Sequence, residues 1–253
     1  DEMWARDLVI DENAVTSAMR ACSSTKEDRE DALELFRRAK PVAPRAWRSA
    51  IEITLLGELE QDIVEEENLP SALLLARAPT PYIKFVAFEK AAGVCELHGD
   101  WRRVLTLLRV LATPQLAVGP RPAVATTIRV CWLYRGEDAD EARDAAASLW
   151  RQAAAAGCYA AIDARGWLQL HEISIPTAQA AVLATLEDMS ALTAPQNNLV
   201  LNTGPGASKP QGALQTKLLA FLASLGVVAE KDAGLIRIDA SQIRDFNAKR
   251  QQK

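Results

Sequence analysis

The 253-residue sequence contains few of the residues that build disulfide frameworks and metal sites, with only four cysteines and two histidines. So few cysteines do not form the framework of a small secreted domain, and two histidines cannot make a histidine-rich metal site. No apolar run approaches the roughly 18 residues of a membrane span. Acidic side chains outnumber basic ones 33 to 29, so the chain lacks the overall positive field of many nucleic-acid-binding proteins.

The residues that are present indicate a folded protein of one or two domains. Apolar residues make up 49% of the sequence and charged residues 25%, a composition that excludes a disordered chain. The length allows a hydrophobic core of useful size. The sequence opens at Asp1 without a secretory signal or a basic presequence. We expect a soluble, globular, intracellular protein with reduced thiols, and composition does not reveal its compartment.

Charge and hydrophobic pattern both change near residue 160. Residues 1–160 carry 20 basic and 25 acidic side chains, whereas residues 161–253 carry 9 and 8. The first part has apolar residues at three- and four-residue spacing, which is typical of amphipathic helices, and the second part alternates short apolar strands with helices. The sequence therefore predicts a helical domain over 1–160, an α/β domain over 161–240 and a basic tail over 241–253.

The first part predicts about four helical hairpins. Prolines interrupt its helical pattern roughly every 35 to 40 residues, a period that is typical of helical-repeat arrays. Cys22, Cys95 and Cys131 are 73 and 36 residues apart, which places them at an equivalent position in the first helix of three hairpins. No CxxC pair or Cys/His cluster accompanies them, so we interpret these thiols as small packing residues.

The second part predicts a layer in the order β-α-β-α-β-β. Ser174 and Pro176 are typical of the start of a helix, and Gly226 is typical of the end of another. The first helix lies between the first two strands, and the second follows the glycine-containing turn at residues 203–206. The strands are expected at residues 167–170, 199–201, 227–229 and 235–238.

Both parts resemble known families. Residues 14–38 and 91–101 resemble pentatricopeptide repeats, the helical hairpins of organellar RNA-binding proteins. Residues 167–240 resemble a Smr (small MutS-related) domain, through Leu168-Gln-Leu-His171 and Thr203-Gly-Pro-Gly206. The two families are often combined in organellar proteins. The resemblance implies a two-domain α+β fold, with an α-solenoid followed by a small α/β domain, in a mitochondrion or plastid.

The Smr resemblance also implies a nucleic-acid site. Active Smr domains cleave nucleic acid with the motifs Leu-Asp-x-His and Thr-Gly-x-Gly. This sequence departs from that pattern at three positions: Gln169 stands in place of the acid, Glu172 in place of a usual glycine, and Ser208 near the position of an expected second histidine. An imidazole without a carboxylate partner is a poor general base, so His171 is the only catalytic candidate and we lean against an enzyme. A glycine-rich turn before a helix can still bind phosphate. The residues expected to contact RNA phosphates are His171, Thr203, Gly204, Gly206, Lys209 and Lys217.

The repeat resemblance implies base-contact positions on the first helices of the hairpins, because such arrays read about one base per repeat. Those positions are Thr16, Glu89 and Ala125. Threonine is a usual reader, but glutamate and alanine are poor ones. Phosphate contacts supply most of the affinity for RNA, and this part is acidic. We therefore expect weak sequence-specific reading by this chain alone.

These observations favour a non-catalytic RNA-binding or ribonucleoprotein-associated protein of an organelle. It would contact RNA through the Smr-like loop and protein partners through the helical repeats. One alternative is a protein–protein scaffold in a large complex such as a mitochondrial or plastid ribosome, and a more distant one is a Smr-type RNA endonuclease. The expected partners are organellar RNA, including ribosomal RNA, and protein subunits of a larger complex, with no cofactor, no metal and no membrane span.

Overall fold

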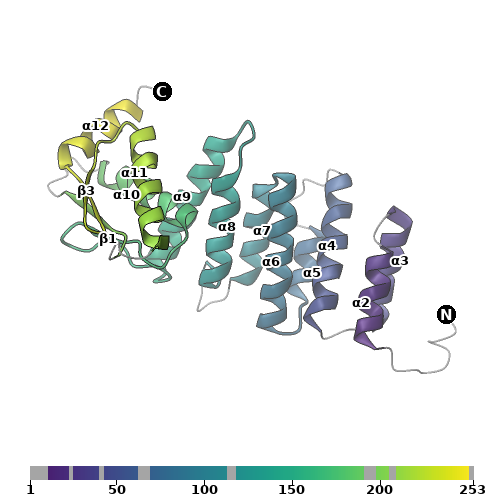
Figure 1. The fold of residues 1–253 in the computed structure, drawn as a ribbon. Coiled ribbons are helices and arrows are strands. Elements are labelled where there is room, and N and C mark those ends of the chain that lie inside the picture. The colour runs from purple at the N-terminus through teal and green to yellow at the C-terminus, as the bar shows by residue number, and fades with distance from the viewer. Residues whose placement is uncertain are drawn as a thin grey trace. The chain divides into compact units, whose positions relative to one another are not determined.

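The protein is mostly helical with one small mixed sheet, which confirms the predicted α+β class (Figure 1). Internal contacts divide it into two compact units, residues 1–115 and 116–253. None of the helices in the described ranges is long and apolar enough to cross a membrane. The computed structural model describes residues 11–22, 25–39, 43–61, 69–112, 118–190, 198–204 and 209–250.

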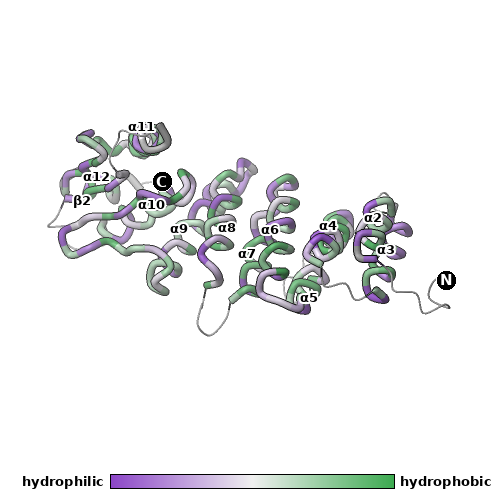
Figure 2. Tube along the Cα trace, turned by 60° about the horizontal axis from the view of Figure 1, so that its bottom comes forward, coloured by the Kyte–Doolittle hydropathy of each residue, from purple (hydrophilic) through white to green (hydrophobic). Residues whose placement is uncertain are grey.

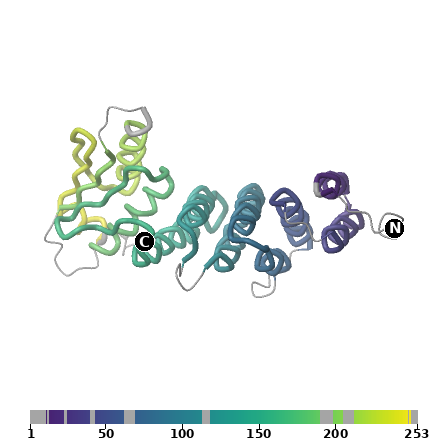
Figure 3. Tube along the Cα trace, turned by 90° about the horizontal axis from the view of Figure 1, so that it is seen from below, coloured from purple at the N-terminus to yellow at the C-terminus, as the bar shows by residue number. Residues whose placement is uncertain are grey.

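In the first unit, the described residues form three helical hairpins, α2/α3, α4/α5 and α6/α7. Helices α2, α4 and α6 pack side by side, and α5 packs on α7 (Figure 3). In Figure 2, α3, α4 and α6 each carry green hydrophobic and purple hydrophilic positions. The helices are α2 (Glu12–Ala21), α3 (Lys26–Ala39), α4 (Pro44–Glu60), α5 (Pro70–Ala76), α6 (Pro81–His98) and α7 (Trp101–Leu111).

Local capping residues set both ends of α6 and the start of α7. The Thr80 hydroxyl accepts a hydrogen bond from the Ile83 N–H at 3.2 Å, with proline at the first position of α6. Gly99 ends α6 with φ of 71°, a conformation that glycine adopts without strain. Asp100 follows at once and accepts from the Arg103 N–H at 3.0 Å, which starts α7. Short-range chemistry thus explains this hairpin without reference to the rest of the fold.

The second unit combines a fourth hairpin, α8/α9, with the four-stranded sheet. The strand order is β1-β2-β4-β3, in which β1 runs parallel to β2 and the other pairs are antiparallel. Leu168 pairs with Leu201 and Leu201 with Ile236, and all three are buried. The elements are α8 (Arg121–Leu133), α9 (Ala139–Ala155), β1 (Trp167–Gln169), α10 (Ile175–Ser190), β2 (Leu199–Asn202), α11 (Lys209–Ser224), β3 (Glu230–Asp232), β4 (Leu235–Ile238) and α12 (Ala240–Arg250).

The third strand lies three residues later than predicted. The Val227 N–H bonds to the Leu222 carbonyl at the end of α11, and the Val228 N–H bonds to Gln242 Oε1 at 3.0 Å. These amides are therefore not part of a strand ladder, although the apolar run at 227–229 suggested one. The chain pairs with β4 only from Glu230 onward.

Most of the segment predicted as a basic tail, 241–253, is helical, because helix α12 spans 240–250. Ile243 and Phe246 are buried, and α12 packs on α10. Two apolar residues three positions apart indicate one face of a helix. Because the residues around them are polar, the helical pattern in the sequence was weak.

The division between the units also differs from the predicted boundary at 160/161, which falls inside the second unit. Helix α10 packs on both α8 and α9. Trp132 Nε1 donates to Gln179 Oε1 at 2.8 Å, and Arg151 pairs with Glu187 and Asp188. The change in sequence pattern marks where strands begin, and the core continues across it.

The thiol environments lead to a labelling prediction. Cys95 and Cys131 are buried, and burial raises the pKa of each thiol to about 12. At pH 8 only about one in ten thousand of these thiols is ionised. We expect intact-mass spectrometry to show two rapid iodoacetamide additions in the native protein, at the partly exposed Cys22 and Cys158. Denatured protein should take four, and rapid addition of four to the native chain would contradict the burial.

Candidate functional site

The two parallel strands β1 and β2 end at the same edge of the sheet, and each continues into a loop that leads to a helix. In sheets of this kind ligands bind outside the carboxyl ends of the parallel strands. Gly204, two residues after the end of β2, has φ of 88°, a backbone conformation that favours glycine. This edge is the candidate functional site, and its residues come from the ends of β1 and β2 and the loops that follow.

A hydrogen-bonded chain of three residues spans the site. The Gly204 N–H donates to Asn202 Oδ1 at 3.0 Å, and Asn202 Nδ2 donates to Gln169 Oε1 at 2.7 Å. The backbone N–H can only donate, so it fixes which atom of Asn202 faces it. That choice in turn fixes Gln169, whose Oε1 accepts and whose Nε2 donates to none of the residues that the structure describes, so that both its N–H groups can meet a ligand or water. Gln169 is half-buried at the edge of the sheet.

His171 lies in the turn that follows β1 and is exposed to solvent. The Leu170 N–H donates to the Asn202 carbonyl at 2.8 Å, so the pairing of β1 with β2 extends to the residue before the histidine. The register therefore places His171 and Gly204 at the same edge. Here the structure brings together two predicted site residues, His171 and Gly204, with Gln169.

Thr203 has a different environment from the one expected of a phosphate ligand. Its side chain is buried, and both its N–H and its hydroxyl donate to the Gly234 carbonyl, at 2.9 and 2.8 Å. The hydroxyl proton is therefore used within the fold. Gln215 Nε2 donates to the Asp232 and Leu235 carbonyls and attaches α11 to the same hairpin. Thr203 and Gln215 hold the loop of the site against β3 and β4.

Of the remaining predicted phosphate contacts, only Lys217 has a side chain that the structure describes. Gly206 and Ser208 lie outside the described residues, as does the side chain of Lys209, whose backbone begins α11. Lys217 is exposed, but it follows the first residue of α11 by eight positions, about 12 Å along the helix axis. Asn202, which sequence reasoning missed, links the two strand ends, and its only signal was an amide directly before the Thr-Gly pair.

The predicted base-contact positions all lie on first helices of hairpins, namely α2, α6 and α8. Thr16 is 6% exposed, so a base could reach little of it. Glu89 is exposed and Ala125 is half-buried. Of these three side chains, only the Glu89 carboxylate is exposed, and a carboxylate repels phosphate.

The described residues contain no group of three or more histidine, cysteine, aspartate or glutamate side chains that could hold a metal ion. The site therefore consists of amides, one imidazole and backbone N–H groups. Comparisons of this chain with protein-family models, with curated proteins and with solved structures give no match.

Glu172 adopts φ of 70°, the only non-glycine residue with positive φ among the described residues. A side chain in this left-handed region costs about 1–2 kcal/mol relative to the right-handed one, a cost that glycine does not have. We expect Glu172→Gly to stabilise the second unit by about 1 kcal/mol in urea unfolding. Glu230→Gly, at an exposed strand position, should instead destabilise it. A loss of stability in Glu172→Gly would contradict this reading of the turn.

Proposed function

We propose that this protein is a non-catalytic RNA-binding subunit of an organellar ribonucleoprotein, with pentatricopeptide-like hairpins followed by a Smr-like layer. The helical hairpins and the order β-α-β-α-β-β of residues 167–238 are those that the two resemblances imply. The left-handed Glu172 supports the Smr-like assignment, because this is the position where that family usually has glycine. The mitochondrial or plastid setting is part of the same proposal.

The observation that carries the proposal is the chain Gln169–Asn202–Gly204 at the sheet edge. A carboxylate at residue 169 would repel an RNA phosphate. The glutamine instead presents a neutral amide whose free N–H groups can donate to a phosphate oxygen. His171 follows two residues later, and its imidazole can donate as well. The edge is thus suited to hold an anion.

The same contacts make strand cleavage unfavourable. A general base needs a partner that holds its imidazole in one tautomer and stabilises the charge that forms on it. Gln169 carries no charge, and its Oε1 already accepts from Asn202. Among the described residues, no carboxylate forms a hydrogen bond with His171. Binding without cleavage is therefore the function that this arrangement supports best.

The test is RNA binding by the full chain, measured by fluorescence anisotropy over a range of salt concentrations, with cleavage followed on gels. We expect micromolar or tighter binding of a structured RNA, with a log–log salt slope of about −3 for three phosphate contacts. His171→Ala should weaken binding about tenfold, the value of one charge-assisted hydrogen bond, whereas His98→Ala should not. His98 is the other histidine of the chain and is also exposed.

Gln169→Asp distinguishes binding from catalysis at the same position. The introduced carboxylate should weaken RNA binding at least tenfold through repulsion of phosphate. Gln152→Asp, at an exposed position of α9, controls for the change in net charge. No RNA binding at physiological salt would leave the scaffold alternative, and cleavage by the wild type that His171→Ala abolishes would establish the endonuclease.

A further inference from the structure

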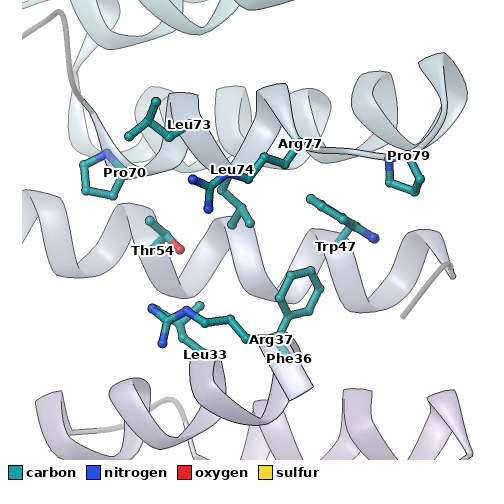
Figure 4. A pocket seen from close by; sticks show the side chains of 10 residues that line it. All are labelled: Leu33, Phe36, Arg37, Trp47, Thr54, Pro70, Leu73, Leu74, Arg77 and Pro79. Carbon is teal, nitrogen blue, oxygen red and sulfur yellow. The ribbon is translucent and has the colours of Figure 1, made fainter. Parts of the chain in front are cut away.

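A groove of about 540 Å³ lies in the first unit, over α4 and between α3 and α5 (Figure 4). Its presence follows from the length of α5. That helix has seven residues, about 10 Å, whereas α4 has seventeen residues, about 25 Å. The short helix cannot cover the whole face of α4, and the uncovered part forms the floor of the groove. All of its lining residues belong to the first unit.

The walls of the groove are mainly aliphatic. Leu33 from α3 and Leu73 and Leu74 from α5 line it, and Leu73 is 47% exposed. Phe36 and Trp47 are only 6% and 7% exposed to solvent. Their rings pack edge to face, with centroids 4.9 Å apart. Single-stranded nucleic acid binds through open ring faces on which bases stack. The buried rings and leucine walls favour aliphatic side chains as ligands.

One end of the groove is positively charged. Figure 4 shows the guanidinium groups of Arg37 and Arg77 extending from α3 and from the end of α5 to either side of Thr54. Arg37 shares the Glu34 carboxylate with Arg38, at 3.3 and 2.9 Å. Arg77 forms no ion pair with any residue that the structure describes. Arg37 and Arg77 are the charged residues among those that line the groove, and none of the lining residues is acidic.

We propose that this groove binds an amphipathic helix of a partner protein, with leucine-like side chains on one face and a carboxylate at the end that meets Arg37 and Arg77. The distance from Trp47 to Thr54 along α4 is seven residues, about 10 Å. This matches two turns of the bound helix, with anchors at positions i, i+3 or i+4, and i+7. The carboxylate complements the guanidinium pair and fixes the direction of the helix.

The experiment is a selection on the full chain with a displayed library of 14-residue helical peptides. Four positions on one face are randomised among Leu, Met, Phe and Ala, and four flanking positions among Asp, Glu, Lys, Arg and Ser. We expect enrichment of two or three leucines at helical spacing with an acid at one end. Fluorescence anisotropy then gives the affinity of the enriched peptide for each variant of the protein.

Arg77→Glu should weaken binding of that peptide at least tenfold, and Leu73→Ser should weaken its binding severalfold. Arg48→Glu, an exposed arginine on α4 that does not line the groove, should leave its affinity within twofold. Circular dichroism checks that all three variants remain folded. Selection without acid enrichment, equal loss in Arg77→Glu and Arg48→Glu, or displacement of the peptide by single-stranded RNA or by a second copy of the chain would each overturn the proposal.

Discussion

Replacing Glu58 by alanine is expected to destabilise the first unit by about 3–5 kcal/mol, the cost of breaking a buried ion pair on one side. Glu58 is 2% exposed, and its carboxylate accepts from the Ser71 N–H and, at 2.9 Å, from the Ser71 hydroxyl. Arg103 Nη1 lies 3.5 Å from the same carboxylate. Alanine would remove the acceptor at the first turn of α5 and one of the two carboxylates beside the buried Arg103 guanidinium, the other being Asp100 at 3.1 Å. Urea unfolding followed by far-UV circular dichroism measures the loss.

Glu58→Gln should be milder than Glu58→Ala. Burial raises the pKa of Glu58 above its ordinary value, with the hydrogen bonds from Ser71 and the charge of Arg103 opposing the rise. The folded state therefore holds the proton more tightly than the unfolded state, and this group's contribution to stability falls as pH rises from about 4.5 through the raised pKa. A neutral amide avoids that loss, and its oxygen can still accept from Ser71.

The double variant Glu58→Gln/Arg103→Met provides the control. It removes both charges and replaces the guanidinium by a side chain of similar length, so neither charge is left buried alone. We expect it to be more stable than Arg103→Met, with a coupling energy of about 1–3 kcal/mol in the double-mutant cycle. Additive single effects would show that Glu58 and Arg103 do not interact, despite their contact across α4 and α7.

The second large effect concerns where the chain can be cut. We expect residues 116–253 to unfold in one cooperative transition and residues 161–253 to lack one. Helix α10 is buried on almost all sides, because the four consecutive residues Ala180, Ala181, Val182 and Leu183 are at most 6% exposed. In the shorter fragment the faces that pack on α8 and α9 would be exposed to water. A helix that is apolar all round is stable only when it is covered.

The energies support this expectation. A domain of 93 residues has a stability of about 5–14 kcal/mol, and the loss of one buried tryptophan costs about 3–5 kcal/mol. Trp132 is 5% exposed, donates to Gln179 and meets the Phe221 ring edge to face at 5.4 Å. Its loss alone therefore removes a large share of that stability. Calorimetry of both fragments is the measurement, and a sharp transition in 161–253 would restore the boundary at residue 160.

In the full chain, Trp132→Ala tests the same packing without truncation. We expect it to destabilise the second unit by about 3–5 kcal/mol. Leu133→Ala is the matched control, since its side chain is 41% exposed and should cost less than 1 kcal/mol. Equal effects of the two substitutions would contradict the role of Trp132 between α8 and α10.

Local signals predicted much of this fold. Helical periodicity identified the helices, and caps such as Thr80 and Asp100 mark their ends. The prediction failed where tertiary contacts decide the structure. Val228 bonds to Gln242, fourteen residues later, and so is not part of a strand. Helix α12 depends on two apolar residues that are buried against α10, and their burial is not visible in the sequence.

The candidate site was predicted in part for the same reason. Gln169 and His171 lie on one short segment, so the motif identified them together. Their link to Gly204 through Asn202 crosses 33 residues of sequence and exists only because β1 and β2 pair in one register. The motif also gave no sign that the Thr203 hydroxyl donates to Gly234. The pairing of the strands decides which hydrogen-bond donors face a ligand, and a linear motif gives no information on strand pairing.

The distribution of the thiols gives the natural chain a built-in pair of attachment points. Cys22 belongs to the first unit and Cys158 to the second, and both are partly exposed while the other two are buried. A donor and an acceptor dye can therefore be coupled to the unmodified sequence, one on each unit. Energy transfer between them would report how the distance between the units responds when RNA or a peptide binds.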